Sequence, residues 1–334
     1  MMKKRLSAPV LAVLAAGALA VPGTAAAVPG RAGPVPGGAA SAGVAPVVSV
    51  RIAVHFDVTA GQLPENVALA PDGTALVTLA AARQVAAVTR AGSVRTLATL
   101  PAPADGGVHT PVLGFPLTTG IARSGDGTLY LLYATGTADL TGVWRVRPGD
   151  RPRRIAALPA EGLPNGLALD ERRGTLYLTD SVLGRIFTVP VSGGTPTTWS
   201  ADPTLASTGF LGANGLKLHD GAVWVSNLDQ GTLLRFPLER GRAGTVEVRA
   251  AGLVGVDDFA FTGRGAEVIA ALNGPNTVVR IRPGGTVTPL LTAADGLQNP
   301  TSVAVRGTTL YVLNAAYLTG TDPNLLLARV PGRH

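Results

Sequence analysis

The sequence predicts an all-β fold, a six-bladed β-propeller whose blades are four-stranded antiparallel sheets. Three observations support this prediction. A segment that reads as strand, turn and strand recurs six times in 334 residues. Its copies are 43 to 54 residues apart, which is the usual length of a propeller blade. The chain also contains 43 glycines and 26 prolines and no long amphipathic helical pattern, as expected for short strands joined by turns.

The clearest copy of the repeat runs from Leu163 to Gly194. Residues 166–169 are apolar, residues 175–179 alternate in polarity, and residues 185–190 form a third apolar stretch, each bounded by turn residues. Residues 195–199 follow as a fourth strand. Four antiparallel strands in about forty residues make one blade.

The six copies can be aligned on the apolar residue that opens the first strand of each blade. These residues are Val67, Ile121, Leu167, Leu216, Phe259 and Val303. Second strands are expected over residues 75–80, 129–134, 176–181, 223–228, 267–272 and 310–315.

The sixth copy has no fourth strand of its own. Residues 49–58 alternate between apolar and polar side chains before the first blade begins, as a half-buried strand does. We expect this N-terminal strand to close the propeller by completing the sixth blade, which removes an exposed sheet edge. The alternative is that it only caps an edge. One domain, the propeller over residues 49–334, then accounts for nearly all of the chain.

The first 48 residues lie outside the repeat. Residues 1–27 resemble a secretory signal peptide, with basic residues at positions 3–5, an apolar run over 6–21 and a cleavage point after Ala27. The apolar run is too short and too interrupted by proline for a membrane span, so we expect a secreted protein with no stable membrane insertion. Residues 28–48 consist mostly of Ala, Gly, Pro and Val, which predicts a flexible leader.

Composition excludes several classes of function. The formal charge of +7 falls to +4 when the three basic residues of the signal peptide are removed, and the remaining basic residues are nearly all arginines scattered along the chain. No basic stripe alternates with stacking aromatic residues, so nucleic acid is not an expected partner. The chain has no cysteine, and it lacks the G-x-S-x-G, H-E-x-x-H and P-loop motifs. A monomer is expected.

Polar residues stand two positions before each of the six aligned apolar residues. In a propeller these positions start the strand that lines the central channel, so they form a ring at one mouth. The ring consists of Glu65, Thr119, Asn165, Asn214, Asp257 and Thr301. Four members carry carboxylate or amide oxygens, which are the ligands that Ca²⁺ prefers. The sequence therefore predicts a Ca²⁺ site made by Glu65, Asn165, Asn214 and Asp257, with another divalent cation as the alternative. Zinc would lack cysteine and clustered histidine.

A structural interpretation of the same residues remains open. Propeller channels hold water and are often polar for that reason alone. Asn-Gly is a common turn dipeptide, so Asn165-Gly166 and Asn214-Gly215 could be turns. That interpretation does not explain why Glu65 and Asp257 stand at the same position of the repeat.

The ring pattern and its surrounding segments resemble a known family. The segments LPENVALAPDG, LPNGLALD, ANGLKLHDGAVWVSN and VDDFAF are similar to those of the gluconolactonase and regucalcin-like (senescence marker protein) propellers, which are related to paraoxonase and diisopropyl fluorophosphatase. The resemblance covers most of residues 50–330 and is strongest over 160–260. One departure is Thr119, where paraoxonases place a channel histidine.

The resemblance implies a Ca²⁺-dependent hydrolase that acts on a small-molecule lactone or ester. The ion would polarise the carbonyl group, and a carboxylate of Asp257, Glu65 or Asp258 would activate water. His109, in the insertion before the second blade, is a further candidate base if its loop folds over the mouth. The competing hypothesis is a non-catalytic extracellular propeller that binds a ligand or a protein at the same mouth.

Overall fold

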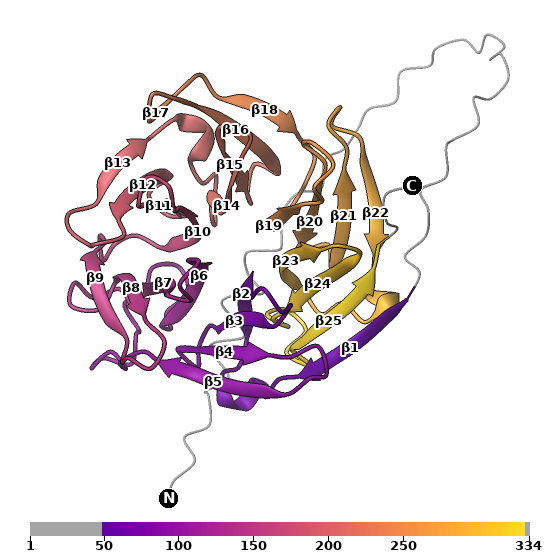
Figure 1. Cartoon of the computed structure of the whole chain (residues 1–334), viewed down its shortest axis with the longest axis horizontal. Helices are drawn as coiled ribbons and strands as arrows, with labels where there is room; N and C mark the ends of the chain where they lie inside the picture. Colours follow the sequence, from indigo (N-terminus) through magenta and orange to yellow (C-terminus); the bar gives the residue numbers. More distant parts are fainter. Residues whose placement is uncertain (1–48, 331–334) are drawn as a thin grey trace, which may run out of the picture.

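The computed structural model describes residues 49–330, and they form six antiparallel sheets arranged around a central axis. Figure 1 shows the sheets following one another around the ring in sequence order, with the first strand of each sheet nearest the centre. The prediction of a six-bladed propeller is confirmed. Residues 1–48, the predicted signal peptide and leader, lie outside the described residues. Within residues 49–330 no helix is long and apolar enough to cross a membrane.

The first three blades each contain four strands in meander order. Blade one consists of β2 (Pro64–Leu69), β3 (Ala75–Leu79), β4 (Gln84–Val88) and β5 (Val94–Thr99). Blade two consists of β6 (Leu117–Arg123), β7 (Leu129–Ala134), β8 (Gly142–Val146) and β9 (Arg153–Ala157). Blade three consists of β10 (Pro164–Asp170), β11 (Thr175–Asp180), β12 (Arg185–Pro190) and β13 (Thr197–Ser200).

The last three blades add small variations. Blade four consists of β14 (Ala213–His219), β15 (Ala222–Asn227), β16 (Thr232–Glu239) and β18 (Glu247–Ala250), with the short β17 (Arg242–Ala243) also pairing with β16. Blade five consists of β19 (Val256–Phe261), β20 (Val268–Leu272), β21 (Thr277–Ile281) and β22 (Val287–Leu291). Blade six consists of β23 (Pro300–Arg306), β24 (Thr309–Asn314), β25 (Asn324–Arg329) and β1 (Val50–His55).

The strand expected over residues 49–58 is β1, which pairs antiparallel with β25 from Val50 opposite Ala328 to His55 opposite Asn324. Soon after β1 the chain turns into a single 3-10 turn, η1 (Val58–Ala60), because the Asp57 side chain accepts the backbone N–H groups of Thr59 and Ala60. Two similar turns, η2 (Pro203–Leu205) and η3 (Ala293–Asp295), lie in connections between blades.

The hydrophobic core lies between the blades. Six clusters of buried side chains each join two neighbouring blades, such as Trp224 of blade four with Phe259 of blade five. Apolar residues alternate along each strand, so each blade presents one apolar face to each neighbour. A seventh cluster lies at the end of the channel where the first strands begin. This packing holds the six first strands at fixed positions around the channel.

Candidate metal centre in the channel

Each of the six ring positions lies in a β-bulge. In blade three the pairing of β10 with β11 shifts register between Pro164 and Leu167, which leaves Asn165 and Gly166 outside the regular ladder. The first strand of every other blade shows a shift around its ring residue. A bulge redirects side chains that a regular strand would send alternately into the two neighbouring blades. The bulges therefore turn the ring residues toward the axis.

Hydroxyl groups connect the bulges of neighbouring blades. Ser226 of blade four donates to the backbone carbonyl of Asp257 in blade five at 2.5 Å. Thr179 of blade three likewise donates to the carbonyl of Asn214 in blade four. The equivalent bond in blade one runs from Thr78 to the carbonyl of Thr119 at 2.7 Å. The ring residues Thr119 and Thr301 donate in turn to the carbonyls of Pro164 at 2.7 Å and Pro64 at 2.9 Å in the next blade. These bonds fix the backbone of the ring from one blade to the next.

The two Asn-Gly pairs lie inside strands β10 and β14 and are not turns. A Cβ atom on Gly166 would lie 2.3 Å from the backbone oxygen of Asn214. A Cβ atom on Gly215 would lie 2.3 Å from Oδ1 of Asp258. The glycines are needed because adjacent first strands approach too closely for any side chain there. The turn interpretation of these dipeptides is therefore wrong.

The ring contains two buried carboxylates whose negative charges repel each other. Glu65 and Asp257 are 6% and 7% exposed, and no basic side chain among the described residues forms an ion pair with either. Burial raises the pKa of Glu65 to about 7, a hydrogen bond from Tyr317 opposes the rise, and the negative charge of Asp258 adds to it. Burial raises the pKa of Asp257 well above its usual range, and the charges of Glu65 and Asp258 add to that effect.

The donor set of the ring fits a hard divalent cation. The side-chain amide of Asn214 lies near Asp257 and opposes the rise of its pKa, while the Oδ1 of Asn214 is buried with no hydrogen-bond partner. Asn165 donates Nδ2 to Ser181 Oγ at 3.2 Å. Two carboxylates and two amide oxygens are therefore available, with a local negative charge that a cation would neutralise. Within residues 49–330 no group of three or more His, Cys, Asp or Glu side chains is arranged to hold a metal, so the amides are essential to such a site.

A second polar layer lies beside the ring and centres on Asp258. Its Oδ2 accepts hydrogen bonds from Lys217 at 2.7 Å, from Ser302 at 2.9 Å and from Asn66 at 3.2 Å, so blades one, four and six all hold a carboxylate of blade five. Its Oδ1 is buried and has no partner. Lys217 was not among the site residues predicted from the sequence. The available indication was that Lys217 is the only lysine after position 4 and stands three residues after Asn214.

An apolar collar surrounds the mouth above the ring. It consists of Leu63, Leu113, Phe115, Leu163, Leu211 and Tyr317 together with smaller neighbours. Leu113 and Phe115 belong to the insertion before blade two, so this loop does lie over the mouth. His109 of the same loop points elsewhere: its side chain is 73% exposed and its Nδ1 lies 2.7 Å from Asp105. The structure therefore brings together Glu65, Asp257 and Asp258 and leaves His109 outside.

Comparison with known proteins identifies relatives by structure alone. No family model matches the chain, and no curated protein sequence matches it. Regucalcin from Agrobacterium tumefaciens is 18% identical over 86% of this chain and 96% of its own, with a TM-score of 0.62. A gluconolactonase from Xanthomonas campestris is 15% identical over 86% and 98%, with a TM-score of 0.58. Virginiamycin B lyase from Staphylococcus aureus is 15% identical over 85% and 99%, with a TM-score of 0.57.

At these identities the likeness establishes the shared propeller fold. The resemblance to gluconolactonase and regucalcin seen in the sequence is thus matched by likeness of structure, while the link to paraoxonase stays a prediction. The structural neighbours also include a PQQ-bound aldose sugar dehydrogenase from Streptomyces coelicolor and a chain of a nidogen–laminin complex. Because one fold carries several chemistries, the function has to be argued from the site.

Proposed function

We propose that this chain is a divalent-cation-dependent hydrolase of the gluconolactonase type, with Ca²⁺ in the channel and a lactone or ester as substrate. One observation carries the proposal. Four oxygen-bearing side chains from four blades converge in buried bulges, and neither carboxylate among them has a basic partner in the described chain. Buried carboxylates are stable as anions only when a positive charge or several donors face them.

Glu65, Asn165, Asn214 and Asp257 would hold the ion. When bound, Ca²⁺ would supply a Lewis acid that polarises a carbonyl oxygen and stabilises the developing oxyanion. The bulges and the hydroxyl bonds between blades keep the four side chains in place before any substrate arrives, which lowers the cost of ordering the site.

Asp258 is the base that the geometry favours. Its Oδ2 is held by three donors, so the carboxylate cannot rotate freely, and its Oδ1 has no hydrogen-bond partner among the described residues and would be the oxygen that takes the proton of water. Lys217 forms an ion pair with this carboxylate, with its ammonium group 2.7 Å from Oδ2. The apolar collar would exclude bulk water from the reacting groups and contact the apolar part of a substrate.

Thermal unfolding in EDTA and in millimolar Ca²⁺ tests the metal site first. An ion that binds only the folded state raises the unfolding midpoint by mass action. We expect this rise in the wild type and its loss in Asn214→Ala. Thr119→Ser is the matched control, because Thr119 occupies a ring position that is not an expected ligand and serine can keep the hydroxyl bond to the carbonyl of Pro164. Hydrolysis of a panel of lactones and aryl esters, with and without Ca²⁺, then tests catalysis.

A non-catalytic binding propeller is the second candidate, and the apolar collar favours it. The collar side chains are largely buried and lie over the ring, an arrangement that also suits an ion with a purely structural role. This candidate predicts the same Ca²⁺-dependent rise in the unfolding midpoint and no product from any substrate of the panel. Product formation that Asp258→Asn abolishes, with the Ca²⁺ effect retained, would exclude it.

The proposed place of action is outside the cell. This part of the proposal rests on the basic, apolar and small-residue pattern of residues 1–27. Expression of the full chain in a secreting host should release protein whose N-terminal sequence begins at Val28. Retention in the cell with Met1 intact would contradict it. Sedimentation of the released protein checks the expected monomer.

A further inference from the structure

A second hollow of about 410 Å³ lies on the face of the propeller opposite the candidate metal centre. It is formed by the connection between β19 and β20 and by the turn between β23 and β24, so it lies between blades five and six. Both connections are at the far end of first strands whose opposite end carries the ring. The hollow therefore shares no residue with the channel site.

Arg280 of β21 is the notable residue of this hollow. It lines the hollow but is only 6% exposed, and its Nε is buried without a hydrogen bond. No hydrogen bond or ion pair joins its guanidinium group to any residue within 49–330. Buried arginines are almost always paired with an anion, because an uncompensated buried charge is strongly unfavourable. Glu267 lines the same hollow, but its side chain is held by Thr262 and forms no ion pair with Arg280, so the guanidinium has no anionic partner among the described residues.

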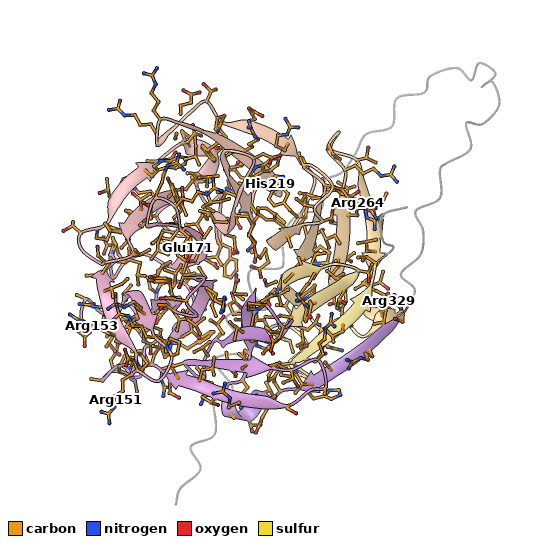
Figure 2. The ribbon with its side chains drawn as sticks, in the orientation of Figure 1. Arg151, Arg153, Glu171, His219, Arg264 and Arg329 are labelled. Atoms are coloured by element: carbon orange, nitrogen blue, oxygen red, sulfur yellow. The ribbon has the colours of Figure 1, made fainter. Side chains whose placement is uncertain are left out.

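A second unpartnered polar group lies beside Arg280 in the sheet. Thr288 of β22 pairs directly with Arg280 in the sheet, and its hydroxyl group is buried without a partner. Directly paired residues of neighbouring strands project to the same face of a sheet, so this hydroxyl is a second donor on that face. Arg264 also lines the hollow, and Figure 2 shows it at blade five, away from the channel.

The charged side chains that line the hollow indicate which kind of anion it would bind. Arg264 and Arg280 bring two positive charges, and Glu267 brings one negative charge, held by a hydrogen bond from Thr262 at 3.0 Å. Arg280 is the cation that has no partner among the described residues, and the negative charge of Glu267 disfavours a phosphate dianion beside it, so a monoanion is favoured. A guanidinium group binds a carboxylate through two parallel hydrogen bonds, which matches its shape and charge.

The remaining walls are apolar. Phe261, Ile269, Val305 and Val330 line the hollow around its charged residues. We propose that this hollow binds a small monocarboxylate, with its carboxylate on Arg280 and its apolar body against these four side chains. The site is independent of the proposed hydrolase, since it lies on the opposite face and needs no metal.

Isothermal titration calorimetry with hexanoate tests this site on the mature protein in EDTA. We expect saturable binding of hexanoate and none of 1-hexanol, which has a similar apolar body and no charge. Arg280→Met keeps the apolar stem and removes the guanidinium, so it should weaken hexanoate binding by about tenfold or more. Arg282→Met is the matched control, because Arg282 is exposed, comes two residues later and does not line the hollow.

Two results would overturn the proposal: hexanoate binding that Arg280→Met leaves unchanged, or no binding in the wild type together with none in a chain that ends at Val330 with an amide in place of the new terminal carboxylate. The shortened chain separates two sources of the carboxylate. Equal affinity in both chains identifies a free ligand. Tighter binding in the shortened chain identifies residues 331–334 as a competitor for the same site. Arg280→Met should remain folded, because it removes an unpaired buried charge.

Discussion

The hydroxyl group of Tyr317, from the loop after β24, donates a 2.5 Å hydrogen bond to Oε2 of Glu65 in β2. Both residues are buried, and the bond joins blade six to blade one at the mouth of the channel. It is the one hydrogen bond to this carboxylate among residues 49–330, and it does not offset the cost of burial: the pKa of Glu65 stays at about 7. Without a bound cation, ionisation of Glu65 therefore lowers the free energy of unfolding.

This relationship predicts how the stability of the metal-free protein depends on pH. The ordinary pKa of Glu65 is 4.5 and its folded value is about 7, so the folded state holds more protons between these values. The free energy of unfolding should then fall as the pH rises from about 4.5 to 7, by roughly 3 kcal/mol from Glu65 alone. Asp257 shifts in the same direction. Urea unfolding in EDTA at several pH values measures this.

Calcium supplies the internal control for that experiment. With millimolar Ca²⁺ present, the loss of stability between pH 5 and 8 should shrink or vanish, because the ion favours the ionised carboxylates. Tyr317→Phe should extend the fall in EDTA to higher pH, since its hydrogen bond lowers the pKa of Glu65. A stability in EDTA that rises over this range would contradict the charge arrangement of the ring.

Asp257→Asn should change stability in opposite directions with and without the ion. In EDTA at pH 7.5 the variant should unfold about 2 °C or more above the wild type, because it removes a buried carboxylate that repels Glu65 and Asp258. In millimolar Ca²⁺ the variant should gain no further stability from the ion, so it should unfold below the wild type. Differential scanning calorimetry with both buffers checks this pair of outcomes. A variant that is less stable than the wild type in both buffers would show that Asp257 has a different role.

The residues that occupy the same position in every copy of the repeat were predictable from the sequence. The six aligned apolar residues lie in the first strands, and the ring positions two residues before them meet in the channel. The strand expected over 75–80 is β3, Ala75–Leu79, and that expected over 310–315 is β24, Thr309–Asn314. This worked because burial imposes the same pattern on every blade.

Features that depend on contacts between blades were not predictable. The bulges around the ring residues have no local sequence rule, and the hydroxyl bonds between blades join residues more than 30 positions apart, such as Ser226 and Asp257. The partner of Lys217 could not be read from its neighbours in sequence because Asp258 is 41 residues away. For His109 the loop lies at the mouth, but the side chain points away from it toward Asp105, which its place in the sequence did not indicate.

Gly166→Ala should disturb the ring without adding charge. The new methyl group would lie 2.3 Å from the carbonyl oxygen of Asn214, so the neighbouring first strand would have to move. We expect a loss of about 1–3 kcal/mol in the free energy of unfolding and a smaller Ca²⁺ effect. Gly274→Ala is the matched control, because nothing lies within 4 Å of its new methyl group. Equal stabilities of the two variants would rule out close packing of blades three and four as the reason for this glycine.

Lys217 provides the last prediction, because its ammonium group is the one basic partner of Asp258 within the described chain. Lys217→Met would leave a carboxylate that is 1% exposed with only two neutral donors. Breaking a buried pair costs several kcal/mol, and Lys217 is a quarter exposed, so we expect a loss of about 2–4 kcal/mol at pH 7.5. The double variant Lys217→Met with Asp258→Asn should recover most of that loss, since no charge is then left unpaired. The double variant could instead be as unstable as the single one. Lys217 would then stabilise the protein through the cation–π contact of its Nζ with Phe259, whose ring centroid is 5.9 Å away.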